Sequence, residues 1–264
     1  MNLQTVIYEM NGSVATIKMN RPDALNALSS QLGSDLNSAI RQAKNDGARA
    51  VILTGNGRAF CAGGDLREMQ AIGQKEGRAE AFLDEPLKML HNVIRSIREA
   101  DIPFVAAVNG VCAGAGVNFA LACDIVFAAD DASFREAFVR IGLTPDCGGT
   151  FFLPRAIGEK LAAELLMTGD SISAERAERI GMINRMVPAA TLMNEAGAMA
   201  QKLAAGPTAS IGRIKRMLNA SFSNNLTSQL SLEAECQLES GRSNDFREGV
   251  AAFFEKRPPG FTGK

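Results

Sequence analysis

Two stretches of this sequence share one pattern, and that internal similarity restricts the folds that the chain can adopt. An apolar run over residues 50–54 is followed by a glycine-rich turn and Cys61-Ala62-Gly63-Gly64. A second apolar run, over residues 104–108, is followed by Cys112-Ala113-Gly114-Ala115. Short, wholly apolar runs are typical of strands buried on both faces of a parallel sheet. Because each turn leads into a helical pattern, we predict an α/β fold with parallel strands and right-handed crossovers.

The N-terminal part begins with a predicted hairpin. Two β-rich runs flank Asn11-Gly12, a pair that supplies the positive φ angles of a tight turn. Ser29 or Ser30 is expected to cap the helix that follows. The glycine-rich segment Gly55–Asp65 is predicted to be a loop.

The last third of the chain has a different character. Leucine and isoleucine recur at helical spacing over residues 83–97, and strand-like runs alternate with helices as far as residue 167. From about Thr191 to Phe254, however, the pattern predicts four helices and no strand. We therefore expect a core over residues 1–195 that binds the substrate and a helical region over residues 196–264 that forms oligomer contacts.

Composition and charge exclude several classes of function. The net charge of the 264 residues is −1, so no overall field attracts nucleic acid or an anionic membrane surface. No apolar run approaches the roughly 20 residues of a membrane-spanning helix, and the first residues lack the pattern of a signal peptide. The five cysteines have the spacing of neither a zinc site nor a disulfide framework, and His91 is the single histidine. We expect a cytoplasmic protein without a metal site.

The two glycine-rich turns predict a specific chemistry. A helix start leaves backbone N–H groups without partners and carries partial positive charge, and small residues let a ligand come close to the backbone. The N–H groups of Gly64 and Ala115 are therefore predicted to converge on one oxygen atom as an oxyanion hole. Spacing alone leaves a second interpretation open, in which the glycines only permit tight packing of helix on sheet. Neither turn has the sequence of a phosphate-binding loop.

Five separated motifs, in order along the chain, resemble the enoyl-CoA hydratase/isomerase (crotonase) family over essentially the whole length. They are NRPDALNAL (residues 20–28), GRAFCAGGDL (57–66), AAVNGVCAGAGVNFALACD (106–124), GLTPDCGGTFFLPR (142–155) and REGVAAFFEKR (247–257). The PDCGGT stretch and the closing motif are most similar to the phenylacetate-pathway ring-epoxide isomerase subgroup of that family. The resemblance implies a crotonase-like spiral of ββα repeats with a helical C-terminal trimerisation region.

The resemblance also implies roles for individual residues. Gly64 and Ala115 take the positions of the two oxyanion-hole donors. Phe253 and Lys256 take those of residues that reach the coenzyme A of a neighbouring subunit, where lysine offers a point charge for phosphate. The surroundings of the adenine and pantetheine are expected at Ala24, Ala62, Asp65 and Leu66. No cofactor is implied besides the coenzyme A that is part of the substrate.

The sequence departs from a hydratase at the two positions where this family carries catalytic glutamates. Those positions fall on Asn118 and Phe138, and neither an amide nor a phenyl ring can act as a general base. Asp146 stands instead where hydratases usually have glycine, and burial in an apolar pocket beside Phe138 should raise its proton affinity. Asp146 is therefore the predicted proton shuttle, although an aspartate after Pro145 also fits a turn or a helix cap.

These features lead to the hypothesis of an acyl-CoA isomerase. It would move a double bond between the 3- and 2-positions, or rearrange a ring 1,2-epoxide, through an enolate held by Gly64 and Ala115. Three alternatives stay open: a residual hydratase activity, a dehalogenating or hydrolytic enzyme with Asp146 as nucleophile and His91 as base, and an acyl-CoA binder without activity. A lone histidine among leucines also fits a residue of the core.

The remaining expectations concern the surroundings of the acyl group and the partners. The pocket wall is expected among Met69, Ile72, Phe82, Leu83 and Phe138. Glu136 is expected to form an ion pair with Arg135 or Arg140 rather than to take part in the reaction. The expected partners are an acyl-CoA substrate and further copies of the chain in a homotrimer or homohexamer, and neither nucleic acid nor a membrane.

Overall fold

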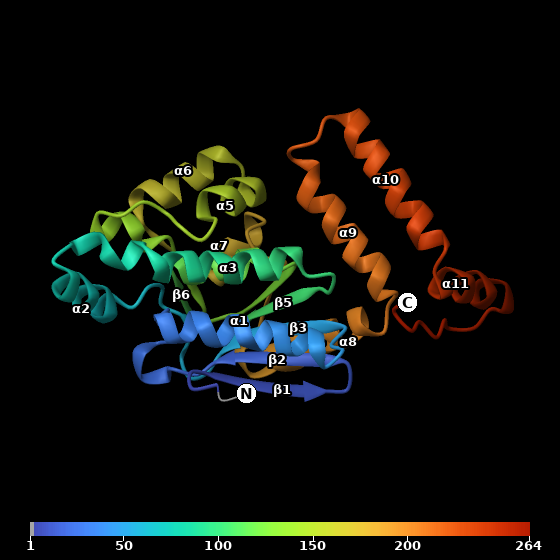
Figure 1. Ribbon diagram of the computed structural model, residues 1–264, viewed down its shortest axis with the longest axis horizontal. Helices are drawn as coiled ribbons and strands as arrows, with labels where there is room; N and C mark the ends of the chain where they lie inside the picture. Colours follow the sequence, from blue (N-terminus) through green and yellow to red (C-terminus); the bar gives the residue numbers. More distant parts are fainter. Residues whose placement is uncertain (1–2) are drawn as a thin grey trace.

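The computed structural model of the protein describes residues 3–264, and residues 1 and 2, with which the expected core region begins, lie outside it. The helices are α1 (Ser30–Asn45), α2 (Leu66–Glu76), α3 (Glu85–Glu99), α4 (Ala115–Ala122), α5 (Gly149–Ile157), α6 (Glu159–Thr168), α7 (Ala174–Arg179), α8 (Leu192–Ala204), α9 (Thr208–Ser221), α10 (Leu226–Gly241) and α11 (Asn244–Glu255). Figure 1 shows that α9, α10 and α11 project from one end of the core. No helix among the described residues is long and apolar enough to cross a membrane.

A six-stranded sheet forms the centre of the core. Its order is β1-β2-β3-β5-β7-β10, and every neighbouring pair is parallel except β1 and β2. The strands are β1 (Val6–Asn11), β2 (Val14–Met19), β3 (Ala50–Gly55), β5 (Phe104–Val108), β7 (Ile125–Ala129) and β10 (Arg185–Val187). All residues of β3 and β5 are buried, as the two wholly apolar runs predict.

The residue pattern did not indicate the strands of a second, four-stranded sheet, although the ββα repeats implied by the family resemblance contain a second strand each. The order of this sheet is β4-β6-β8-β9, with β4 (Ala59–Cys61), β6 (Val111–Ala113), β8 (Ser133–Arg135) and β9 (Ser171–Ser173). The prediction of a loop throughout Gly55–Asp65 is therefore wrong at β4. Each of these strands has three residues, which is too short for an alternating pattern to be distinguished from a turn.

The two sheets are built by one repeating path of the chain. β3 is followed by β4, β5 by β6 and β7 by β8, and helices follow each pair. Successive repeats lie side by side in both sheets, because β3, β5 and β7 are neighbours in one and β4, β6 and β8 in the other. This arrangement confirms the α/β prediction and the spiral of ββα repeats. It also places the ends of β4 and β6, and hence the two glycine-rich turns, next to each other.

Local predictions near the N-terminus are confirmed in detail. β1 and β2 form an antiparallel hairpin in which Asn11 pairs with Val14, and Gly12 has a φ of 58°. Ser29, not Ser30, caps α1, since its hydroxyl accepts a hydrogen bond from the Leu32 N–H at 3.2 Å.

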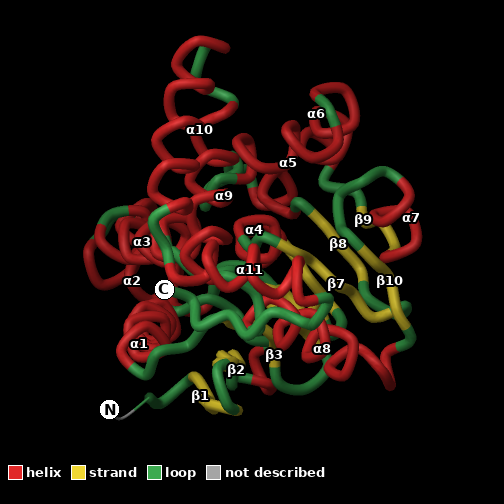
Figure 2. The backbone as a smooth tube through the Cα atoms, turned by 90° about the vertical axis from the view of Figure 1, so that its right-hand side faces the viewer, coloured by secondary structure: helices red, strands yellow, loops and turns green. Residues whose placement is uncertain are grey.

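The C-terminal region consists of helices, as predicted. α8 packs against β3 and β5, and Figure 2 shows it next to β3. Because α8 spans Leu192–Ala204, it crosses the expected boundary between residues 195 and 196. α9 is fastened to the core by Lys215, whose buried ammonium group lies 2.8 Å from the Asp124 carboxylate and 2.6 Å from the Ile97 carbonyl oxygen. Short 3-10 helices join other elements: η1 (Pro22–Ala24), η2 (Ala79–Leu83), η3 (Ala137–Ile141) and η4 (Ala189–Thr191).

Candidate active site

The two glycine-rich turns lie against each other at the ends of β4 and β6. These strands are parallel neighbours in which Cys61 pairs with Cys112. Gly63 has a φ of 91°, and a Cβ atom there would lie 3.0 Å from the Ala113 carbonyl oxygen. Gly114, with a φ of 51°, lies on the other side of the same contact. Glycine is needed at both turns because the conformation is left-handed and the backbones nearly touch.

The backbone N–H groups of Gly64 and Ala115 are free to bind a ligand. The chain on either side of Gly64 is held by Leu28, which donates to the Gly63 carbonyl at 2.7 Å and accepts from the Asp65 N–H at 3.0 Å. Ala115 is the first residue of α4, where N–H groups have no partner within the helix. Within residues 3–264 neither of the two N–H groups donates a hydrogen bond. Both residues line one cavity of about 170 Å³.

The cavity has a mostly apolar wall and a single carboxyl group. The residues that line it are Ala62, Gly63, Gly64, Leu66, Met69, Phe82, Leu90, Gly114, Ala115, Arg135, Ala137, Phe138, Arg140, Ile141, Leu143 and Asp146. The wall prediction holds for Met69, Phe82 and Phe138. It is wrong for Ile72 and Leu83, which do not line the cavity; in η2 it is Phe82 that is buried, whereas Leu83 is exposed.

Asp146 lies in the loop before α5 and is largely removed from solvent. Burial raises the pKa of its carboxyl group, while the neighbouring Cys147 and His91 side chains act in the opposite direction. Its Oδ1 atom is buried and has no hydrogen-bond partner among the described residues. A carboxyl group in this environment is a stronger base than an exposed aspartate, and it faces the same cavity as the two free N–H groups.

Asn118 fixes the backbone that carries this aspartate. Its side chain is fully buried on α4, and its amide nitrogen donates to the Asp146 carbonyl oxygen at 2.8 Å. α5 begins directly against it, since a Cβ atom at Gly149 would lie 2.7 Å from the amide nitrogen. Asn118 therefore holds the Asp146 loop in place and does not reach the cavity surface.

His91 also contacts the backbone next to Asp146. Its Nε2 atom accepts a hydrogen bond from the Cys147 N–H at 3.3 Å, and the residue does not line the cavity. Because Nε2 accepts a hydrogen bond from the backbone, it is not placed to act as the base that would activate water to attack a covalent intermediate on Asp146. Among the described residues, no group of three or more histidine, cysteine, aspartate and glutamate side chains is arranged to hold a metal ion.

The expected ion pair of Glu136 does not form. Glu136 is 3% exposed, and both of its carboxyl oxygens lack a hydrogen-bond partner within the described part of the chain. Arg140 pairs with Asp170 instead, at 3.0 Å. Burial, and after it the charge of Asp146, raise the pKa of Glu136 to about 8. The sequence does carry a signal for this burial, because Glu136 alternates with exposed Arg135 and shares the inward face of buried Phe134.

Four residues expected near coenzyme A lie around the first turn. Ala62 and Leu66 line the cavity, and Leu66 is half exposed at its mouth. Ala24 lies in η1, and the carbonyl of the next residue, Leu25, accepts a hydrogen bond from the Ala62 N–H at 3.0 Å. The Asp65 carboxylate already has partners within the protein, because it caps α2 and forms an ion pair with Arg21 at 2.8 Å.

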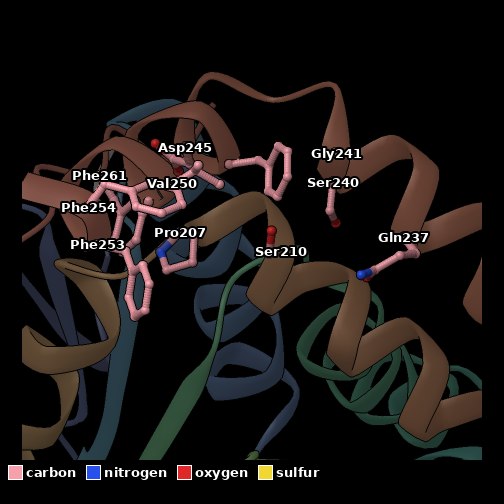
Figure 3. Close-up of a pocket in the computed structure, with 12 residues that line it drawn as sticks. Pro207, Ser210, Gln237, Ser240, Gly241, Asp245, Val250, Phe253, Phe254 and Phe261 are labelled. Carbon is pink, nitrogen blue, oxygen red and sulfur yellow. The ribbon is translucent and has the colours of Figure 1, made fainter.

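Phe253 and Lys256 lie far from this cavity in the same chain. Both belong to the end of α11, which is at the opposite end of the molecule from α2 (Figure 1). Phe253 is 78% exposed and borders a surface pocket of about 620 Å³ together with Phe254 and Phe261 (Figure 3). In the single chain these residues therefore border a different pocket from the one that holds Gly64 and Ala115.

Comparisons with known proteins agree with this fold and these motifs. Residues 9–264 match the family model described as enoyl-CoA hydratase/isomerase. A probable enoyl-CoA hydratase of Rhodobacter capsulatus is 44% identical over the full length of both chains. A 1,2-epoxyphenylacetyl-CoA isomerase of Escherichia coli is 40% identical over 99% of this chain and 100% of its own.

A solved structure shares the whole architecture. The crystal structure of a putative enoyl-CoA hydratase from Streptomyces coelicolor covers 100% of this chain and 96% of its own, with a TM-score of 0.93 and 36% identity. Family model, relatives and structure therefore lead to one conclusion. The chain belongs to the enoyl-CoA hydratase/isomerase (crotonase) family.

Proposed function

We propose that this family member is an acyl-CoA isomerase that moves a double bond from the 3-position to the 2-position of the acyl group. One observation carries the proposal: Asp146 is the carboxyl group that lines the cavity holding the free N–H groups of Gly64 and Ala115. A base and an oxyanion hole facing one small space are what enolate chemistry needs.

The reaction needs one proton carrier. The Asp146 carboxylate takes a proton from C2, and the electron pair of the C2–H bond moves into the thioester to form a dienolate. The N–H groups of Gly64 and Ala115 stabilise the negative oxygen. Asp146 then returns the same proton to C4, which leaves the double bond between C2 and C3. No water and no other reactant is consumed.

The wall of the cavity supports an acyl group with a ring as a second class of substrate. Phe82, Leu90 and Phe138 offer flat or branched apolar surfaces, which suit an aromatic-derived ring. The Escherichia coli relative carries the name of an isomerase acting on such a ring, 1,2-epoxyphenylacetyl-CoA. We include a ring epoxide attached to the coenzyme A thioester among the proposed substrates.

Hydration of an enoyl-CoA is the competing function, because the Rhodobacter capsulatus relative is named a probable hydratase. Hydration requires groups that activate water and deliver a proton. The amide of Asn118 is engaged with the Asp146 carbonyl, and Phe138 has no titratable group. The hydrolytic alternative is weakened by the engagement of His91 Nε2 with the Cys147 N–H.

Ultraviolet absorbance separates the two main functions. A trans-3-enoyl-CoA mixed with the enzyme should gain the absorbance of the conjugated 2-enoyl thioester, whereas a hydratase given a trans-2-enoyl-CoA would remove that absorbance. We expect the gain to be the faster process. A rapid loss with the 2-enoyl substrate and no gain with the 3-enoyl substrate would identify a hydratase and reject the isomerase proposal.

The exposed end of α11 supports a homotrimer or homohexamer in which each subunit completes the coenzyme A site of its neighbour. We expect Lys256→Ala to raise KM for an acyl-CoA roughly tenfold with little change in kcat, because a hydrogen bond from a charged group contributes about 1.5 kcal/mol to substrate and transition state alike. Steady-state kinetics measure this, with exposed Lys202→Ala as the control. An unchanged KM, or a monomeric mass in sedimentation, would count against the shared site.

A further inference from the structure

The peptide unit that joins Asp146 to Cys147 is held on both sides by side chains from other parts of the chain. Its carbonyl oxygen accepts a hydrogen bond from the side-chain amide of Asn118, on α4, at 2.8 Å. Its N–H group donates a hydrogen bond to Nε2 of His91, on α3, at 3.3 Å. Most backbone groups in proteins pair with other backbone groups. Here side chains of two separate helices fix the orientation of one peptide plane, directly next to the proposed base.

The turn that contains this peptide unit has an unusual backbone for its sequence. Asp146 opens a tight turn, which the Gly149 N–H closes with a hydrogen bond to the Asp146 carbonyl oxygen at 3.0 Å. Both central residues have positive φ angles, 48° at Cys147 and 86° at Gly148, as in a type I′ turn. Glycine, asparagine and aspartate dominate at such positions, and a cysteine is strained there. The conformation of Cys147 therefore needs support from outside the turn.

The two supporting side chains also connect the proposed base with the proposed oxyanion hole. Asn118 stands about one helical turn after Ala115 on α4, so one helix carries an N–H donor and a support of the Asp146 loop. Asn118 is fully buried, His91 is half-buried, and neither residue lines the cavity. Their effect on a substrate in this cavity is therefore exerted through the backbone that carries Asp146.

We propose that His91 is a positioning residue that, together with Asn118, keeps Cys147 in its left-handed conformation and thereby directs the Asp146 carboxyl group at the reacting carbon atoms. This role rests on the proposed isomerase function, in which Asp146 moves one proton between C2 and C4. Without the hydrogen bond to His91, the turn relaxes toward negative φ at Cys147, and Asp146 moves with the peptide unit that it shares. A displacement of about 1 Å lowers the rate of such a step by about 100-fold.

Three variants of His91 separate positioning from packing. Glutamine carries an oxygen acceptor as many bonds from Cα as Nε2, leucine has no acceptor, and asparagine has one that is a bond too short. We expect kcat for a trans-3-enoyl-CoA to fall about 10–100-fold in His91→Leu and His91→Asn, with KM within about twofold of the native value. His91→Gln should stay within about threefold of the native kcat. Asn92→Leu, at an exposed position of the same helix, is the control and should keep the native kinetics.

Rescue by glutamine decides between the two roles, because a residue that only fills space is not replaced by a hydrogen-bond acceptor. Equal losses of kcat in His91→Gln and His91→Leu would overturn the proposal, and so would a native kcat in both His91→Leu and His91→Asn. A raised KM with an unchanged kcat would show a role in binding and would overturn it as well. Circular dichroism checks the fold, and His91→Asn supplies the comparison if His91→Leu does not fold.

Hydrogen–deuterium exchange, followed by mass spectrometry, tests the support of the turn without turnover. The segment that contains Cys147 should exchange faster in His91→Leu than in the native protein or in His91→Gln, because its N–H group has lost the acceptor. If the native protein has no isomerase activity but these differences in exchange occur, the support of the Asp146 loop stands and the proposed reaction falls. If the segment exchanges at the same rate in all three proteins, the role of His91 is refuted.

Discussion

Replacing Asp146 with asparagine should lower kcat for a trans-3-enoyl-CoA by a factor of about 10²–10⁴, the usual contribution of a positioned general base. The amide occupies the same space but cannot take the proton from C2. Binding of a saturated acyl-CoA, measured by calorimetry, should change little, since the cavity wall and both N–H groups remain. The variant should fold as well as the native chain because it removes a carboxyl group whose ionisation is opposed by burial.

The Asp146→Asn prediction has a matched control and a result that would contradict it. Exposed Asp131→Asn makes the same chemical change outside the cavity and should keep the native rate. In the native enzyme the acidic limb of kcat/KM should lie above the ordinary pH range of an aspartate near 3.9, because burial raises the pKa of Asp146 and the base must be ionised. Full isomerase activity in Asp146→Asn would remove Asp146 from the mechanism.

Replacing Ala115 with proline should lower kcat by about 10²–10³, the usual effect of losing one oxyanion-hole donor. Proline has no N–H group, and it is tolerated at the first position of a helix, where Ala115 stands at the start of α4. The preceding residue is glycine, so the restriction that proline places on its neighbour is easily met.

Single-turnover kinetics and circular dichroism together measure this effect. Ala115→Gly keeps the N–H group and removes one methyl group from the cavity wall, so it is the appropriate control and should lose much less activity. The native fold should be retained in both variants. If Ala115→Pro is folded and turns over at the rate of Ala115→Gly, the Ala115 N–H does not stabilise the reacting oxygen.

A large part of the fold could be predicted from the sequence because its signals are local. The wholly apolar runs that become β3 and β5, the turn at Gly12 and the serine cap of α1 depend on residues close together in the chain. The four-stranded sheet could not be predicted in the same way. Strands such as β4 exist because β6 lies beside them, and three residues carry no pattern of their own.

The candidate site, like the fold, could be predicted from the sequence only in part. The paired turns indicated Gly64 and Ala115 as donors, and the absence of the usual glutamates drew attention to Asp146. These roles remain predictions, although the structure places all three residues in one cavity. The sequence shows only that Asn118 cannot act as a base, and nothing in the residue pattern indicates its hydrogen bond to the Asp146 carbonyl oxygen.

The sequence by itself determined the α/β class, the helical last third of the chain and the two turns that leave N–H groups free, because propensity, capping and glycine conformation act over a few residues. Only the tertiary structure decided which side chains lose water together. Glu136 stands next to Arg135 in the sequence, where an ion pair was expected, yet the fold buries its carboxyl group without a hydrogen-bond partner among the described residues, and burial and the charge of Asp146 raise its pKa. Desolvation and the charge of a neighbour set the proton affinity of such a group, and both depend on contacts that sequence spacing does not describe.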